Sequence, residues 1–405
     1  MNIKKRSSGM NVKNFFTFIF TLWYGTEIIF NTTLKSILGI SIGVLNNIVS
    51  WFVFALLMIQ IIFLQSYKKK ELIVVMAITL PLIIATVLSG NRQMLSTWMF
   101  IVAAKNDDFD KIVRIAYRIS LIMIPFVIVL CGLGFIENYT FMRGDIRRYS
   151  LGFLHPNYLG VRVFQLVLCN CYVNRDKLNI SNYGYIVLAI MFSFKVPNSQ
   201  TIYISMIVFL VLLLIYKCIE NQKQIFVKLY GDGLLIGAII LNALSLLLSF
   251  IDVNRYSLLL WIDRWMSRRF SWGHRVWQIY GTSFLGQRIY YSEEETRLIG
   301  IDSRLFLDNT YVCIFLTYGI LVFLIFSISY IFLMRKMIVH SSYILVIILF
   351  LYALYGVMES GLYMIKYNIF LIAFAELLYH KTNTKKNLNE KENHQLNISV
   401  VNMND

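Results

Sequence analysis

Residues 44–66 read VLNNIVSWFVFALLMIQIIFLQS, a run of 23 residues without one charged side chain. A helix that crosses the hydrocarbon core of a bilayer needs roughly 20 mostly apolar residues. This stretch has that length and is followed by the basic run Lys68-Lys69-Lys70. It therefore predicts a membrane-spanning helix with a charged boundary.

The rest of the chain has the same character. Of its 405 residues 58% are hydrophobic and 15% are charged, against about 25% charged residues in an ordinary soluble domain. This composition excludes a disordered chain, a disulfide-rich scaffold and a nucleic-acid-binding domain. We predict an all-α polytopic membrane protein of about twelve spans: 14–33, 44–66, 71–90, 93–104, 112–136, 156–173, 183–197, 199–216, 231–251, 309–334, 341–358 and 360–379.

The positive charges predict the orientation of these spans. The net charge is +16, and the lysine-rich segments fall in alternate loops, which the positive-inside rule assigns to the cytoplasm. Both termini are then cytoplasmic. We expect one transmembrane domain over residues 1–380 and a disordered cytoplasmic tail over 381–405. The five cysteines have neither metal-ligand nor redox spacing, so we expect no metal and no cofactor.

The outward-facing positive charges differ in kind, since 13 of the 16 are arginines. A guanidinium binds phosphate oxygens through a two-pronged fork, whereas lysine acts as a point charge. The arginines therefore predict a phosphorylated or acidic ligand at the outer leaflet. The alternative is that they contact lipid headgroups or loop acids such as Asp263. They are Arg92, Arg143, Arg147, Arg148, Arg162, Arg255, Arg264, Arg268, Arg269, Arg275, Arg288, Arg297 and Arg304.

The longest outward loop, 252–308, exceeds a simple connector, and long structured loops are usually functional. Its middle, 257–280, is compatible with one interfacial helix. On a helical wheel Arg264, Arg268 and Arg275 fall within roughly 40° of one another, beside a stripe of tryptophans. This pattern predicts an arginine ridge that binds substrate. The alternative is an interfacial anchor without a binding role.

The shorter outward loop ends in His155-Pro156-Asn157, which opens a predicted span. Proline suits the first turn of a helix, so His155 falls at the helix cap. Arg162 then lies about 9 Å inside the span, and Lys366 lies at a similar depth in the last span. A charge inside a span is a candidate functional residue. The alternatives are that these side chains reach back to the interface and that His155 is structural.

Several of these motifs resemble those of Wzy-type polysaccharide repeat-unit polymerases, within the superfamily of O-antigen ligases and polymerases. The run Gly152-Phe153-Leu154-His155-Pro156-Asn157 resembles their GF-x-HPN motif. The order of motifs and about twelve spans, with a large outer loop before the third-last, match the group. The other stretches are AAKN with FDKIVRIAYRI (103–119), His274-Arg275-Val276-Trp277 with Gly281 and Gly286, and Asp308-Asn309-Thr310-Tyr311 with Tyr318-Gly319.

The resemblance implies an enzyme of the bacterial plasma membrane. It would transfer a growing glycan from undecaprenyl diphosphate onto an incoming lipid-linked repeat unit at the outer leaflet, in O-antigen, capsule or exopolysaccharide synthesis. It implies a flippase and a chain-length regulator as partners. The chemistry expected is metal-independent.

The site residues follow from this reaction. Arg275 is the first choice to stabilise the leaving diphosphate, and a general base must take the acceptor proton. Asp308 is preferred over His155 as that base. The predicted substrate-binding residues are Arg147, Asn157, Arg162, Arg264, Arg268, Asn309, Tyr311 and Lys366.

One departure from the family concerns the turn after Pro197. Many members have an arginine there that is thought to contact the lipid diphosphate, but this chain reads Asn198-Ser199-Gln200-Thr201. Either another outer arginine substitutes, or the turn is misaligned. Asp308 stands where ligases have histidine, which favours a polymerase over a ligase. A ligase-like glycan transferase, a flippase or other transporter, and a purely structural assembly protein remain as alternatives.

Overall fold

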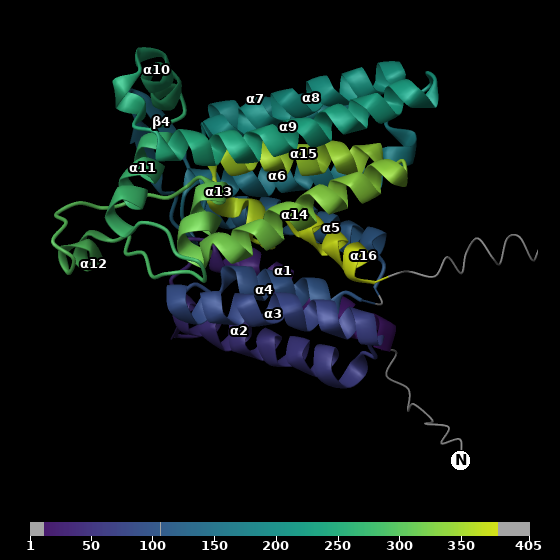
Figure 1. Cartoon of the computed structure of the whole chain (residues 1–405), viewed down its shortest axis with the longest axis horizontal. Coiled ribbons are helices and arrows are strands. Elements are labelled where there is room, and N and C mark those ends of the chain that lie inside the picture. Colours follow the sequence, from purple (N-terminus) through teal and green to yellow (C-terminus); the bar gives the residue numbers. More distant parts are fainter. Residues whose placement is uncertain (1–11, 106, 380–405) are drawn as a thin grey trace, which may run out of the picture.

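The computed structural model describes residues 12–105 and 107–379, and these residues are mostly helical (Figure 1). The predicted cytoplasmic tail, 381–405, lies outside the described residues. The all-α class is confirmed by the element order.

The first half of the chain forms helices, with one β-hairpin between α1 and α2 and another between α5 and α6. Its elements are α1 (Val12–Phe30), β1 (Ser36–Ile37), β2 (Ile40–Ser41), α2 (Ile42–Ile59), the π-helix η1 (Gln60–Leu64), α3 (Lys69–Ser89), α4 (Gln93–Ala103), α5 (Phe109–Gly132), β3 (Thr140–Arg143), β4 (Ile146–Tyr149), α6 (Pro156–Val173), the 3₁₀ turn η2 (Arg175–Lys177) and α7 (Ile180–Lys195).

The second half contains the longest α-helix, α9, and the longest loop. Its elements are α8 (Gln200–Ile219), α9 (Gln224–Phe250), η3 (Val253–Arg255), α10 (Ser257–Trp265), α11 (Arg269–Tyr280), α12 (Glu293–Arg297), α13 (Thr310–Cys313), the π-helix η4 (Ile314–Tyr318), α14 (Gly319–Val339), α15 (Tyr343–Met358), η5 (Ser360–Tyr363), η6 (Ile369–Phe374) and α16 (Ala375–Leu378).

Six helical segments of the described chain are long and apolar enough to cross a membrane, so a membrane protein is supported. The first predicted span forms α1 but is not among the six, and the count of twelve stays a prediction. The six are Ile42–Leu64, Lys69–Ser89, Phe109–Gly132, Gln200–Ile219, Gln224–Phe250 and Thr310–Val339.

The two ends of the helical bundle differ. One end, which we call the loop end, carries β4, α10, α11 and α12, whereas α16 lies at the other (Figure 1). At the α16 end, Lys105 pairs with Glu71 and lies 4.7 Å from the ring centre of Tyr379, and the Lys336 ammonium bonds to the Glu376 carbonyl. The assignment of the lysine-rich segments to the cytoplasm stays a prediction.

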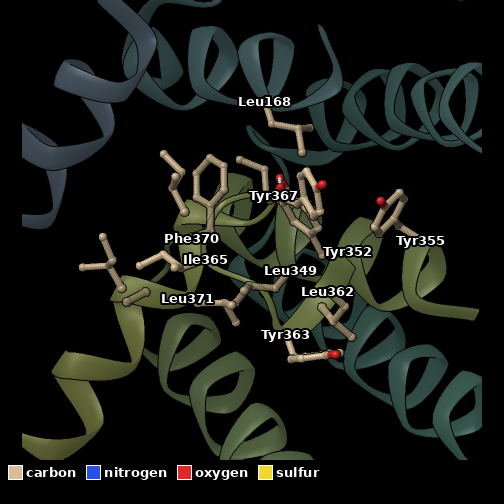
Figure 2. Close-up of a cluster of buried hydrophobic side chains, with 14 of the residues drawn as sticks. Leu168, Leu349, Tyr352, Tyr355, Leu362, Tyr363, Ile365, Tyr367, Phe370 and Leu371 are labelled. Atoms are coloured by element: carbon tan, nitrogen blue, oxygen red, sulfur yellow. Dashed lines mark hydrogen bonds between the residues drawn. The ribbon is translucent and has the colours of Figure 1, made fainter. Parts of the chain in front are cut away.

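Helix α15 is the buried centre of the bundle and packs against α6, α8, α9 and α14. In lipid the hydrophobic effect does not separate one apolar helix from another, so association depends on close packing and interhelical hydrogen bonds. Aromatic side chains supply much of that packing. Figure 2 shows Tyr352 and Tyr355 of α15 beside Tyr363, Tyr367 and Phe370 of the segment that follows.

The predicted twelfth span, 360–379, is not one α-helix. Two 3₁₀ helices and a short α-helix replace it, and residues 364–368 between them are irregular. Irregular backbone at membrane depth is tolerated where protein satisfies its polar groups. Side chains from elsewhere satisfy them here: Thr310 bonds the carbonyl of Glu359 (2.6 Å), Thr97 that of Tyr363 (2.9 Å), Arg162 that of Lys366 (2.8 Å) and Tyr352 that of Tyr367 (2.9 Å).

The predicted helix over 257–280 is also broken, at Ser267 and Arg268, which have φ of 58° and 59°. The Asp263 carboxylate fixes this turn by accepting hydrogen bonds from the backbone N–H groups of Phe270 (2.8 Å) and Ser271 (3.3 Å). The wheel that aligned Arg264 with Arg268 and Arg275 assumed a continuous helix and is therefore wrong. Gly273 lies inside α11, where a Cβ would come within 2.9 Å of the Ser249 hydroxyl.

Candidate functional site

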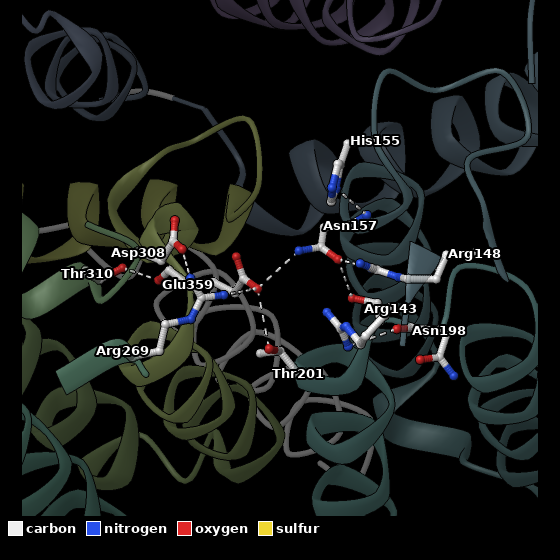
Figure 3. A network of polar contacts seen from close by, with 11 residues as sticks. Arg143, Arg148, His155, Asn157, Asn198, Thr201, Arg269, Asp308, Thr310 and Glu359 are labelled. Carbon is white, nitrogen blue, oxygen red and sulfur yellow. Dashed lines mark hydrogen bonds and ion pairs between the residues drawn. The ribbon is translucent and has the colours of Figure 1, made fainter. Parts of the chain in front are cut away.

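The polar centre of the loop end is Glu359, which follows α15 in extended conformation (φ −138°, ψ 147°). Its side chain is only 18% exposed. Three elements point a polar group at its Oε1 oxygen, each at 3.4 Å: Asn157 of α6, Thr201 of α8 and Arg269 of α11. We call these residues, with Asp308, Arg148 and Arg143, the Glu359 cluster (Figure 3).

The contacts to Glu359 are long, and within the described residues its Oε2 oxygen accepts no hydrogen bond. Burial raises the pKa of Glu359 above its ordinary value of 4.5, and the positive charges of Arg269, Arg143 and Arg148 oppose that rise. Desolvation disfavours the charged form of a carboxyl group. Glu359 is thus a weakly held carboxylate with one free oxygen.

Arg269 links two carboxylates. Its Nη1 forms an ion pair with Asp308, and its Nη2 lies 3.4 Å from Glu359. The turn at Ser267 and Arg268 makes this possible, because it starts α11 with Arg269 facing the bundle while Arg268 stays exposed. Of these two adjacent arginines, Arg269 therefore faces the helical bundle and Arg268 faces the surface of the protein.

The hairpin of β3 and β4 delivers two further arginines. Phe141 pairs with Arg148 and Met142 with Arg147, so consecutive residues lie on opposite faces of the ribbon. Arg148 is 5% exposed; its Nε donates to the Pro197 carbonyl (2.8 Å) and its Nη2 to the Asn157 Oδ1 (2.5 Å). Burial and the charge of Arg143 lower the pKa of Arg148 to about 10, which leaves it cationic at neutral pH.

The same register turns Arg147 away from the cluster, and this predicted substrate ligand is exposed. Arg143 lies on the cluster side and its Nη1 donates to the Asn198 carbonyl at 3.4 Å. Arg143 and Arg148 therefore hold the turn 197–199. Close packing of α6 against that turn needs a small residue, since a Cβ on Gly160 would come within 2.9 Å of the Ser199 Cβ.

His155 caps α6 as predicted, because its Nδ1 accepts from the Asn157 backbone N–H at 3.1 Å. Its ring centre lies 4.7 Å from that of Phe141. Burial, with the charges of Arg148 and Arg143, lowers the pKa of His155 to about 4. At neutral pH the imidazole is therefore neutral, and its Nδ1 is occupied as an acceptor. The geometry favours a role in placing Asn157.

We accordingly expect His155→Asn to keep most of the activity. Asparagine is a strong capping residue, and removal of a general base lowers a rate by about 100- to 10,000-fold, so a loss of only about threefold marks a structural role. His155→Ala removes the cap and is expected to destabilise the protein by about 1 kcal/mol, measured by thermal denaturation. A loss of 100-fold in a stable His155→Asn variant would restore His155 as the base.

The arginines expected to form a ridge lie outside the cluster. Arg275 is exposed and donates to the Ser303 hydroxyl at 2.8 Å. With Arg268 and Trp272 it lines a surface cavity of 470 Å³. Arg264 is exposed on α10 and does not line that cavity. The arginines of the predicted ridge therefore lie on the surface of the protein and outside the Glu359 cluster.

Asn309 and Tyr311 have structural contacts. The Asn309 side chain caps α13 by accepting from the N–H groups of Tyr311 (3.0 Å) and Val312 (3.3 Å). The Tyr311 hydroxyl donates to the Ala353 carbonyl inside the bundle. Both residues are buried. They position Thr310, which holds the backbone of Glu359, and their role in substrate binding stays a prediction.

Arg162 and Lys366 are buried and half-buried, and they meet at another site, since the Arg162 Nη1 donates to the Lys366 carbonyl. Of the predicted residues, the structure brings Asn157, His155 and Asp308 to the Glu359 cluster.

Sequence reasoning missed Glu359 and Thr201 as site residues, and it named Arg148 and Arg269 only within the set of thirteen outward arginines. Glu359 carried a usable signal, because it is an acid within the apolar run 343–365. No feature of the sequence distinguishes Arg269 from its neighbour Arg268.

The described residues contain no group of three His, Cys, Asp or Glu side chains that is placed to hold a metal ion. We therefore assign no metal ligands. The guanidinium groups of the Glu359 cluster can bind an anion, and its two carboxylates can accept a proton.

No family model matches the chain, and neither the search of curated proteins nor that of solved structures finds a match. The residues themselves therefore carry the functional argument.

Proposed function

We propose that the chain is a polysaccharide repeat-unit polymerase of the bacterial plasma membrane, which transfers a glycan from undecaprenyl diphosphate onto a second lipid-linked unit. One observation carries the proposal: three arginines and two carboxylates converge in the Glu359 cluster, at one end of an apolar helical bundle. The motif resemblance points to the same reaction.

The arginines fit the leaving group. Negative charge grows on the diphosphate as the bond to the sugar breaks, and preorganised cations in a water-poor site stabilise that charge. Arg148 and Arg269 have little contact with water. Arg143 and Arg148 bond the carbonyls of Asn198 and Pro197, in the turn where family members have the arginine that this chain lacks. We propose that Arg143 and Arg148 take the place of that missing arginine.

The carboxylates fit the acceptor. The acceptor hydroxyl forms a bond to the anomeric carbon, the diphosphate leaves with the electron pair of the broken bond, and a carboxylate takes the hydroxyl proton. Asp308 is engaged by its direct ion pair with Arg269, whereas Glu359 has a free oxygen. We therefore prefer Glu359 as the base, with Asp308 orienting Arg269.

A transporter of lipid-linked oligosaccharides is the second candidate, because one observation favours it. Transporters place their sites at unwound helices inside the membrane, and the segment 359–368 is unwound backbone between helical pieces. A ligase-like transferase would use the same cluster with a different acceptor.

Reconstitution separates these functions. We expect purified protein in liposomes with undecaprenyl-diphosphate-linked repeat units to produce a ladder of longer lipid-linked glycans, with release of undecaprenyl diphosphate. Gel electrophoresis of labelled glycans measures the ladder. Movement of units across the bilayer without elongation would indicate a transporter, and elongation that requires an added non-lipid acceptor would indicate a ligase. Either result contradicts the polymerase.

A further inference from the structure

A second basic site lies deeper in the bundle, around Arg162 of α6. This side chain is 1% exposed. Its Nη1 donates to the Lys366 carbonyl, but within the described residues its Nε and Nη2 are buried without a hydrogen-bond partner. A buried donor left unsatisfied costs about 1–3 kcal/mol, and more when it is charged. The guanidinium therefore has unused capacity for an acceptor.

Two tyrosine rings lie beside this guanidinium. The rings of Tyr24 and Tyr367 each have their centre 5.7 Å from the Arg162 Cζ. Tyr158 in turn stacks on Tyr367 at 6.0 Å. Aromatic faces stabilise a cation but do not accept its in-plane N–H groups as an oxyanion does. The Arg162 Nε and Nη2 thus still lack an oxygen acceptor among the described residues.

The charge around Arg162 is unbalanced. The Lys366 ammonium lies 3.7 Å from the Glu27 carboxylate, longer than a hydrogen bond, and Glu27 accepts instead from the Asn31 amide at 2.8 Å. Arg162 has no ion pair within the described residues, and the carboxylate that faces Lys366 already accepts from Asn31. Lys366 and Glu27 keep 21% and 14% side-chain exposure, so this edge of the site is open while Arg162 lies behind it.

This second site is joined to the Glu359 cluster by two elements. The segment 359–368 has Glu359 at one end and Lys366 near the other. Helix α6 contributes Asn157 to the Glu359 cluster and Arg162 to the second site. A molecule bound at one site is therefore next to the backbone that shapes the other.

We propose that Arg162 and Lys366 bind the diphosphate of a second lipid-linked substrate, separate from the one held by the Glu359 cluster. This inference rests on the proposed function, in which both substrates carry a diphosphate and only one is cleaved. The Glu359 cluster has the base and the cations for the leaving diphosphate. At the second site the one carboxylate, Glu27, accepts a 2.8 Å hydrogen bond from Asn31 and faces Lys366, and we assign the two cations to the acceptor diphosphate, which stays intact.

The number of diphosphates bound per chain tests the proposal. The probe is farnesyl diphosphate, added to the full-length protein in nanodiscs and counted by isothermal titration calorimetry. We expect two molecules per wild-type chain, one for Lys366→Met and one for Arg269→Gln. Arg175→Gln, which removes an arginine paired with Asp110, is the matched control and should keep two.

Two further ligands show whether the protein recognises the diphosphate or the lipid chain of the probe. Inorganic pyrophosphate should compete for both sites, and farnesol should bind neither. One molecule per wild-type chain, two for Lys366→Met, or equal binding of farnesol would overturn the second site. Arg162→Gln should also bind one molecule. If that variant fails to fold, Lys366→Met decides, because the Lys366 ammonium has no hydrogen bond to the described residues. Elongation by a chain that binds one diphosphate refutes only this inference, whereas two bound diphosphates without elongation refute only the polymerase.

Discussion

Arg269→Ala is expected to lower the rate of polymer formation by about 100-fold or more, the usual effect of removing one preorganised group that stabilises charge in a transition state. Arg269 contacts both Asp308 and Glu359. Its loss removes a cation from the leaving diphosphate and leaves two carboxylates without their shared partner. Lipid-linked single units should accumulate, as seen on gels of labelled glycans from membranes with equal amounts of each variant.

Arg269→Lys should fail almost as completely. An ammonium is a single point charge, whereas the guanidinium reaches two carboxylates through separate nitrogens. Arg275→Ala is the comparison, because Arg275 is exposed and contacts the Ser303 hydroxyl and the Trp272 ring and no carboxylate among the described residues, and a smaller loss is expected. Arg297→Ala, another exposed arginine of the long loop, controls for loss of surface charge. If Arg275→Ala abolished polymer and Arg269→Ala did not, the Glu359 cluster would not be the site.

Arg269→Ala and Arg269→Lys need a check of folding, since Arg269 joins α11 to the segments that carry Asp308 and Glu359. The thermal midpoint of each variant in detergent provides it. A variant that loses polymer but keeps its midpoint has lost a chemical role.

The apolar runs predicted the helices well, and the reason is that bilayer thickness fixes the length of a span. The same reasoning failed at 360–379. Hydropathy cannot detect that Thr97, Arg162, Thr310 and Tyr352, from distant parts of the chain, satisfy the carbonyls of an unwound segment. Those contacts exist only in the folded protein.

The arginine ridge failed for a related reason. One residue along a helix turns a side chain by 100°, so the assignment of Arg268 or Arg269 to the bundle depends on where α11 begins. That start is set by the Asp263 carboxylate and by positive φ at Ser267 and Arg268. The motif His155–Asn157 was located correctly, since a proline in the first turn fixes a helix start locally.

Glu359→Gln is expected to reduce polymer formation by about 100-fold or more, the lower range for loss of a general base. Glutamine keeps the size of the side chain and an acceptor oxygen for Asn157 and Thr201. The Thr310 bond to the Glu359 carbonyl is unaffected, because it involves the backbone. The fold should therefore persist, and the loss would report on the proton acceptor.

The pH dependence distinguishes Glu359 from other bases. A base acts when deprotonated, so activity should fall as pH decreases through the pKa of Glu359, which burial holds above 4.5. His155, with a pKa of about 4, is protonated only at lower pH and cannot set this limb. Initial elongation rates of wild type and Glu359→Gln between about pH 4 and 8 measure it. The residual activity of the variant should not show the limb. An unchanged limb in Glu359→Gln would move the role of base to Asp308, whose Asp308→Asn variant should then lose the limb instead.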